Sequence, residues 1–139
     1  MYEILDGLYL ASFADVSRRG REARDYFIIN CSKDLPMLSP TNVRVPIDDT
    51  PSENERMLGF FRPVTNLIHK RIRAGDEVIV HCWAGQQRSA AVVTAYIMKW
   101  HGLSHDQAKT YVRHHKPDAF LDGATFDPAL ESWDYITHK

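Results

Sequence analysis

Short apolar runs of strand length alternate along this chain with longer stretches in which apolar residues recur at the spacing of a helix. The first two runs flank Asp6-Gly7, which is the strongest two-residue signal for a β-hairpin. The later runs are nearly continuous in apolar residues, as is typical of strands buried on both faces. The strands expected from these runs are Glu3–Leu5, Leu8–Leu10, Tyr26–Cys31, Val43–Ile47 and Glu77–His81.

The helical stretches carry recognisable start and stop signals. Apolar residues fall on one stripe over Ser52–Arg73, Gly75 then provides a stop, and Pro63 is a candidate kink in the middle. Ser104 and Gln107 have the spacing of a capping box. The helices expected are Ser12–Arg18, Ser52–Arg73, Ser89–Trp100, one that begins after Ser104, and one from Asp127 to about Thr137.

Strands that alternate with helices predict a single α/β domain over residues 1–139, with a central, mainly parallel sheet of about four to five strands flanked by helices. The hydrophobic share of 44% is enough for a core without disulfides. Ligands of such sheets bind beyond the carboxyl ends of the strands. Cys82 stands at such an end, between the strand expected over Glu77–His81 and the most apolar helix.

Charge and composition exclude several classes of function. The net charge of −1 and the pI of about 6.6 provide no basic surface, so nucleic acid is not an expected partner. No apolar run reaches the roughly 20 residues of a membrane span, and the N-terminus lacks the pattern of a signal peptide. Two cysteines without a CxxC pair therefore predict a reducing, intracellular location, in the cytoplasm or the nucleus. Nothing in the pattern sets an oligomeric state.

Cys82 and Arg88 are separated by five residues, enough for a loop that curls around a small anion. The amides of such a loop and the positive end of the following helix converge on one point, where Arg88 offers a fork suited to two phosphate oxygens. The same field favours the thiolate of Cys82, a nucleophile for phosphoryl transfer, and Gly85 lets the backbone turn. A buried structural cysteine would leave the glycine and the arginine unexplained. Cys31 and Cys82 also lack the spacing of a zinc site.

The stretch HCWAGQQRS is similar to the HC-x5-R-[ST] signature of cysteine-dependent protein phosphatases, and most similar to their dual-specificity branch. VRVPIDDTPSEN resembles the segment with that family's general acid, and INCSKDLP resembles its central strand. SAAVVTAYIMKWHGLSHDQAKTYVR resembles the helix pair after the loop, and KPDAFLDGATFDPALESW resembles the terminal segment more loosely. The chain is thus identified as a small, atypical or viral-like member. The resemblance implies a protein tyrosine phosphatase-like fold of the dual-specificity type, with a shallow active site.

The resemblance also implies a role for each residue of the motif. Cys82 is the nucleophile that becomes a cysteinyl-phosphate, Arg88 binds the phosphate, and the Ser89 hydroxyl bonds the sulfur. His81 orders the loop rather than transferring protons. No metal or other cofactor is needed, because loop amides and arginine stabilise the charge. The residues expected to bind phosphate are Trp83, Ala84, Gly85, Gln86, Gln87 and Arg88.

The leaving oxygen needs a proton, so a carboxylic acid is expected on a neighbouring loop. Asp48 and Asp49 are adjacent, and the chemistry alone does not distinguish them, because both could be turn formers after a strand. The family pattern of an apolar strand, a variable residue and then Asp matches Asp49. Asp49 would later act as the base toward the attacking water. Gln87 departs from the pattern, since the family usually has serine there.

The expected function is hydrolysis of phosphotyrosine and phosphoserine or phosphothreonine on proteins, with phosphoproteins as partners. An RNA 5′-triphosphatase or a phosphoinositide phosphatase would use the same chemistry, but such relatives generally have a more basic approach surface, and this loop has no lysine. A pseudophosphatase scaffold, which binds phosphate without turnover, is favoured only by Gln87.

The sequence leaves two alternatives open, one for Trp83 and one for Cys31. Trp83 either lines the rim of the pocket or covers the end of the sheet. Cys31 is either an inert thiol or a partner of Cys82 in a disulfide formed under oxidation.

Overall fold

The computed structural model describes residues 1–39 and 42–138, and within these residues the strands form one five-stranded sheet of order β1-β2-β5-β3-β4. β1 and β2 are the antiparallel hairpin predicted around Asp6-Gly7, and the other neighbours are parallel. The predicted α/β class with a mainly parallel sheet is therefore confirmed. The strands are β1 Tyr2–Leu5, β2 Leu8–Ser12, β3 Phe27–Asn30, β4 Val43–Arg44 and β5 Val78–Cys82.

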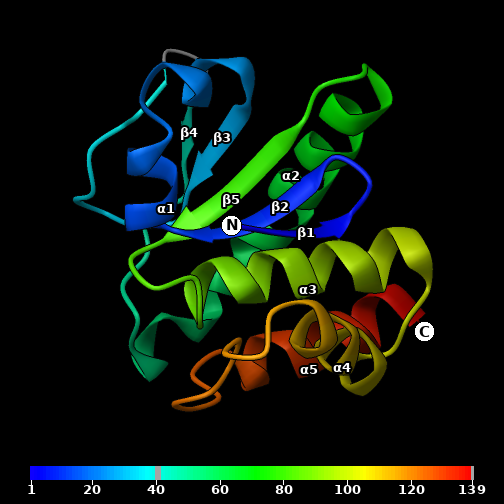
Figure 1. Cartoon of the computed structure of the whole chain (residues 1–139). Helices are drawn as coiled ribbons and strands as arrows, with labels where there is room; N and C mark the ends of the chain where they lie inside the picture. The colour runs from blue at the N-terminus through cyan, green and yellow to red at the C-terminus, as the bar shows by residue number, and fades with distance from the viewer. Residues whose placement is uncertain (40–41, 139) are drawn as a thin grey trace.

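Helices cover the sheet on both faces (Figure 1). One face carries α1 and a 3-10 helix, and the other carries the larger group of α2 to α5. The capping box predicted at Ser104 and Gln107 is present at the start of α4. The helices are α1 Phe13–Arg18, α2 Asn54–Arg73, α3 Arg88–His101, α4 His105–His115 and α5 Asp127–His138, with 3-10 helices at Gly20–Asp25 and Pro51–Glu53. In the described part of the chain, none of these helices has the length and apolar character needed to cross a membrane.

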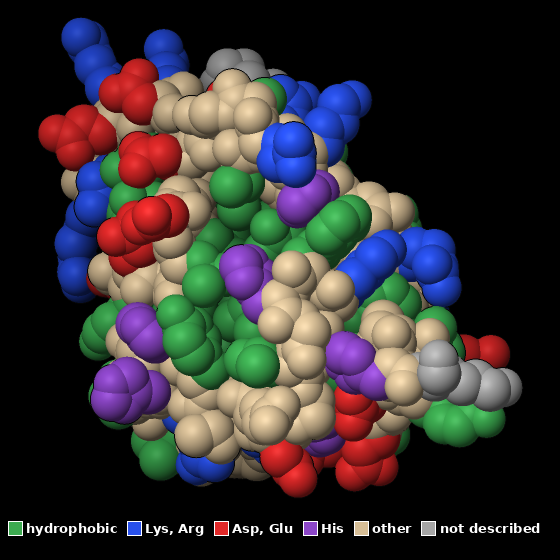
Figure 2. Space-filling view, turned by 90° about the vertical axis from the view of Figure 1, so that its right-hand side faces the viewer, with side chains coloured by type: hydrophobic (Ala, Val, Ile, Leu, Met, Phe, Trp, Pro, Cys, Tyr) green, Lys and Arg blue, Asp and Glu red, His purple; other side chains and the backbone are tan. Residues whose placement is uncertain are grey.

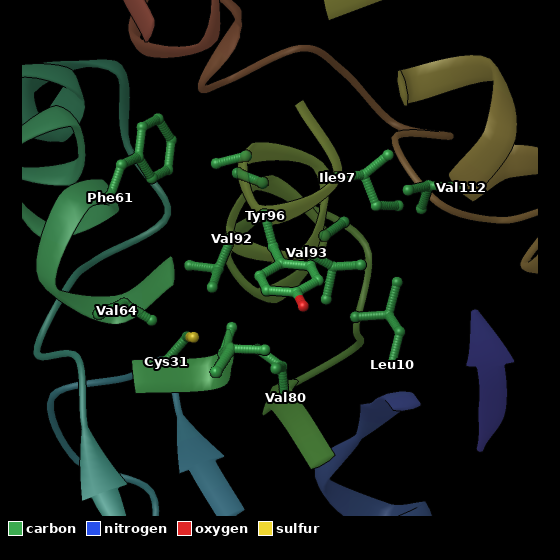
Figure 3. Close-up of a cluster of buried hydrophobic side chains, with 14 of the residues drawn as sticks. Leu10, Cys31, Phe61, Val64, Val80, Val92, Val93, Tyr96, Ile97 and Val112 are labelled. Carbon is green, nitrogen blue, oxygen red and sulfur yellow. The ribbon is translucent and has the colours of Figure 1, made fainter. Parts of the chain in front are cut away.

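The central strand β5 is buried along its whole length because apolar layers lie on both faces of the sheet. Val78 and Val80 point into the larger cluster under α2 to α5, while Ile79 points into the smaller cluster beside α1. Figure 3 shows the larger cluster, where Val80 and Leu10 lie close to Val93 and its neighbours on α3. Burial on both faces explains why this strand reads as a continuous apolar run.

Several predicted boundaries differ from the structure by one or two residues, and the end of β4 differs most. The strand expected over Val43–Ile47 ends at Arg44, although the amide of Val45 still donates to Asn30 O at 2.8 Å. Pro46 faces the open side of this edge strand, where its missing amide hydrogen removes no ladder bond. The helix expected from Ser52 begins at Asn54, and it runs through Pro63 without a break.

The three parallel strands at the centre of the sheet end at the same edge. Ser12 at the end of β2 pairs with Cys82 at the end of β5, and Asn30 at the end of β3 pairs with His81. This register places the predicted nucleophile at the carboxyl edge of the sheet, where α/β proteins bind ligands.

Candidate active site

A pocket of about 220 Å³ opens at the carboxyl edge of the sheet, directly above the end of β5. The chain leaves β5 at Cys82, turns through a five-residue loop and enters α3 at Arg88. This connection aims the positive end of α3 at the strand end. The pocket is lined by Asp49, Cys82, Trp83, Ala84, Gln86, Gln87, Arg88, Asp122 and Thr125.

The sulfur of Cys82 has one side-chain hydroxyl beside it. Cys82 is 3% exposed, and its Sγ lies 3.1 Å from Oγ of Ser89. Because Ser89 belongs to the first turn of α3, the helix fixes the position of that hydroxyl. A hydroxyl that donates to sulfur stabilises a negative charge there, in a free thiolate and in a departing one.

His81 lies under the loop and does not line the pocket. Its imidazole is fully buried, and burial lowers its pKa. Nδ1 lies 3.3 Å from the carbonyl oxygen of Cys82, and since a carbonyl can only accept, Nδ1 carries the proton. A neutral, buried ring that holds a loop carbonyl fits the predicted loop-ordering role.

The loop backbone has the properties of an anion cradle. Within the part of the chain that the structure describes, the amides from Trp83 to Arg88 donate to no acceptor of the protein. Gly85 has a φ of 71°, and a Cβ there would lie 2.7 Å from the backbone oxygen of Ala11. Only glycine fits this close approach to β2, so the predicted turn residue is also required by packing.

Arg88 connects the loop with the segment that carries the two aspartates. Its Nη1 donates to the carbonyl oxygen of Ile47 at 3.2 Å. Ile47 is fully buried and immediately precedes Asp48. The guanidinium is thereby held between the wall of the pocket and the acidic segment. Among the residues that the structure describes, no other group accepts a hydrogen bond from it, which leaves its remaining N–H groups for phosphate oxygens.

Asp48 and Asp49 have different surroundings, although they are neighbours in sequence. Asp48 accepts a hydrogen bond from Nζ of Lys33 at 2.8 Å, and this bond lowers the pKa of its carboxyl. Asp49 lines the pocket together with Cys82. A carboxylate held ionised in a pair with lysine is a poor proton donor, so Asp49 is the better placed acid of the two.

The segment before α5 holds the loop from the opposite side. The amide of Phe120 donates to the carbonyl oxygen of Gln86 at 2.8 Å, and Nε2 of Gln86 donates to Asp118 at 3.2 Å. Nε2 of Gln87 donates to the carbonyl oxygen of Gly123 at 3.0 Å. The residue that departs from the family pattern therefore uses its longer side chain to attach the loop to this segment.

Lys116 lies buried beside the loop, and its burial and its ion pair could not be predicted from the sequence. It is only 2% exposed, and its ammonium group pairs with Asp118, the residue that also holds Gln86. Burial opposes ionisation of Asp118, but the hydrogen bonds from Lys116 and Gln86 outweigh it and lower its pKa. A Cβ on Gly85 would meet Cε of Lys116 at 3.2 Å, so the lysine stem packs directly against the loop. Nothing in the local sequence Lys116-Pro117-Asp118 distinguishes this buried lysine from a lysine exposed to solvent.

Lys116→Met is expected to lower kcat for p-nitrophenyl phosphate about tenfold, because the unpaired Asp118 no longer positions the loop. Steady-state kinetics with a thermal melt will separate loss of positioning from loss of folding. Lys99→Met is the matched control, since Lys99 lies near the far end of α3 and donates to Asn66 of α2, away from the loop. Equal kcat values for Lys116→Met and wild type would show that the ion pair does not position the loop.

Cys31 and Cys82 are both free thiols in this structure. Burial raises the pKa of the Cys31 thiol well above its usual value, and the nearby Cys82 adds to this effect. A thiol held in its protonated form is a poor nucleophile, which favours the inert alternative for Cys31.

A second hollow, of about 400 Å³, lies at the other end of the sheet strands. Figure 2 shows this side of the molecule, where apolar and histidine side chains gather around the hollow. The rings of His69 and Trp100 stack in it with centroids 3.6 Å apart. It is larger than the pocket at Cys82, but neither cysteine lines it.

Comparison with known proteins agrees with the geometry at Cys82. The family model described as "Dual specificity phosphatase, catalytic domain" matches residues 8–134. The chain belongs to the dual-specificity phosphatase family. This dual-specificity phosphatase is 36% identical over 111 residues to "Putative tyrosine phosphatase 123R" of Invertebrate iridescent virus 6, a match that covers 80% of this chain and 76% of that protein.

A longer human relative and a solved structure give the same family. "Dual specificity protein phosphatase 8" of Homo sapiens is 34% identical over 120 residues, which is 82% of this chain but only 19% of that protein. The crystal structure of human DUSP28 superposes with a TM-score of 0.87 at 26% identity, over 99% of this chain and 95% of that one. This dual-specificity phosphatase thus has the predicted protein tyrosine phosphatase-like fold.

Proposed function

We propose that this chain hydrolyses phosphotyrosine and phosphoserine or phosphothreonine on proteins through a cysteinyl-phosphate intermediate. The observation that carries the proposal is a single pocket lined by Cys82, Arg88 and Asp49, with the Ser89 hydroxyl 3.1 Å from the sulfur. A nucleophile, an anion-binding fork and a proton donor are the groups that metal-independent phosphoryl transfer requires.

In the first step the thiolate of Cys82 attacks phosphorus, so that a P–S bond forms while the bond to the leaving oxygen breaks. Asp49 gives its proton to that oxygen, and the substrate hydroxyl departs neutral. Arg88 and the amides of the loop hold the non-bridging oxygens throughout, which stabilises the charge that spreads over them.

In the second step a water molecule attacks phosphorus and gives its proton to the carboxylate of Asp49. The P–S bond breaks, and the sulfur leaves as a thiolate that accepts a hydrogen bond from Ser89. Inorganic phosphate is released, and both Cys82 and Asp49 return to their starting states. Because a thiolate is readily oxidised, the proposal includes a reducing, intracellular location.

The pocket favours a phosphate monoester on a protein over a more highly charged substrate. Among its lining residues in the described part of the chain, Arg88 is the one cation, while Asp49 and Asp122 are acidic. A triphosphate or a multiply phosphorylated inositol carries more negative charge than this balance accommodates. A pseudophosphatase remains the alternative from a different class, with Gln87 as its support.

The test is phosphate release by the purified chain in EDTA. The substrates are matched phosphotyrosine and phosphothreonine peptides, a phosphoinositide in micelles and a 5′-triphosphorylated RNA. We expect the peptides to be cleaved with the highest kcat/KM. Faster cleavage of the RNA or the lipid would show that the substrate is not a phosphoprotein, while the cysteine-dependent mechanism would still hold. Tight binding of vanadate without any turnover would instead identify a pseudophosphatase.

A further inference from the structure

A large aromatic side chain stands exposed beside the nucleophile. Trp83 directly follows Cys82, lines the pocket and is 65% exposed. Its ring stacks on Phe13 at the start of α1, with centroids 6.1 Å apart and planes 15° apart. The amide of Phe13 also donates to the carbonyl oxygen of Trp83 at 3.0 Å. Trp83 is therefore held by Phe13 on the rim of the pocket and does not cover the end of the sheet.

A second exposed apolar side chain belongs to the segment that holds the loop from the other side. Leu121 is 62% exposed and stands between Phe120, whose amide bonds the loop at Gln86, and Asp122, which lines the pocket. Phe120 has a φ of 60°, which is rare for a residue with a side chain. Its own ring is buried while Leu121 faces outward.

The two side chains come from opposite sides of the loop. In Figure 1, α1 lies above the loop that follows β5, and the segment that leads into α5 lies below it. Phe13 of α1 supports Trp83, and Phe120 of the lower segment attaches Leu121 to the loop. Trp83 lines the pocket and Leu121 adjoins Asp122, which also lines it, so we expect a peptide whose phosphorylated residue enters the pocket to pass close to both side chains.

We infer that Trp83 and Leu121 select phosphoproteins with large apolar side chains next to the phosphorylated residue. The inference rests on the proposed function and names the substrate class of the same site. Apolar surface left exposed at the mouth of a pocket is the kind that a bound partner covers. The acidic lining residues Asp49 and Asp122 disfavour acidic neighbours in the substrate by like-charge repulsion.

An anionic membrane fits this rim less well than a peptide does. Membrane surfaces recruit proteins through lysines and arginines near the apolar contact. The loop from Trp83 to Gln87 has no cation, and the mouth carries the two carboxylates of Asp49 and Asp122. The substrate's own polypeptide is therefore the occupant that matches both the apolar and the acidic character of the rim.

The test compares phosphopeptides that differ only in the two residues flanking the phosphorylated one, as leucine, alanine or glutamate. For wild type we expect kcat/KM to be about tenfold higher with leucine than with alanine, and lowest with glutamate. Trp83→Ala and Leu121→Ser are each expected to reduce the ratio between leucine and alanine toward one, mainly through KM. Leu121→Ser is expected to leave turnover of p-nitrophenyl phosphate unchanged, because that substrate has no flanking residues.

Tyr135→Ala is the matched control, since Tyr135 on α5 is also 65% exposed and should leave the ratio unchanged. Peptide binding to Cys82→Ser by fluorescence anisotropy measures the same preference without turnover. Cleavage of all peptides at equal rates would overturn the rim inference and leave the proposed function standing. If wild type cleaves none of the peptides but Cys82→Ser still binds the leucine peptides most tightly, the proposed function is overturned and the inference about the rim stands. Faster turnover on phosphatidylcholine vesicles with phosphatidylinositol 3-phosphate, lost in Leu121→Ser, would make the rim a membrane contact and overturn the inference.

Discussion

Cys82→Ser is expected to lower hydrolysis of p-nitrophenyl phosphate by at least about 10³-fold in EDTA. A serine hydroxyl keeps nearly the same volume but is not ionised near neutral pH, so no P–O bond to the enzyme forms. The measurement is steady-state phosphate release at mildly acidic pH, together with rapid quench for a labelled enzyme intermediate in wild type.

The variant should still bind vanadate and melt at the same temperature as wild type, because the loop amides and Arg88 are unchanged. Cys31→Ser is the control, since this second buried thiol does not line the pocket. Turnover by Cys82→Ser at a rate near that of wild type would exclude the cysteine mechanism.

Asp49→Asn is expected to lower kcat by about 10²- to 10³-fold on a substrate with a poor leaving group, because the departing oxygen loses its proton donor. The loss should be large with phenyl phosphate and small with p-nitrophenyl phosphate, since nitrophenolate leaves without a proton. The comparison of these two substrates in one variant separates acid catalysis from a general disturbance of the pocket.

Asp48→Asn is the matched control for this prediction. It removes the 2.8 Å ion pair with Lys33 but leaves the lining of the pocket intact, so kcat should stay within a few-fold of wild type on both substrates. A larger loss in Asp48→Asn than in Asp49→Asn would transfer the acid role to Asp48.

The sequence was informative where a feature is encoded locally. The hairpin at Asp6-Gly7, the capping box at Ser104 and the turn at Gly85 depend on residues a few positions apart, and the structure contains all three. The loop from Cys82 to Arg88 belongs to this group, because the strand, the loop and the helix that form it are consecutive.

Features that depend on distant segments could not be predicted from the sequence. The different surroundings of Asp48 and Asp49 depend on Lys33, which is 15 positions away from Asp48. The contact of Gln86 with Asp118 joins residues 32 positions apart, and no local pattern encodes such a pairing. Trp83 belongs to the same group, since its place on the rim is set by Phe13, far away on α1.

The attachment of the loop to Asp118, Phe120 and Gly123 also has a consequence for biosynthesis. The chain is made from its N-terminus, so β5 and α3 leave the ribosome before the segment that completes the loop. Contacts of such large sequence separation form late, because closing a long loop costs entropy before the contacts compensate for it. The nascent chain therefore carries Cys82 before its loop is fully attached, and we expect competence for phosphate binding to arise only after residues 118–123 have been synthesised and have folded onto the loop.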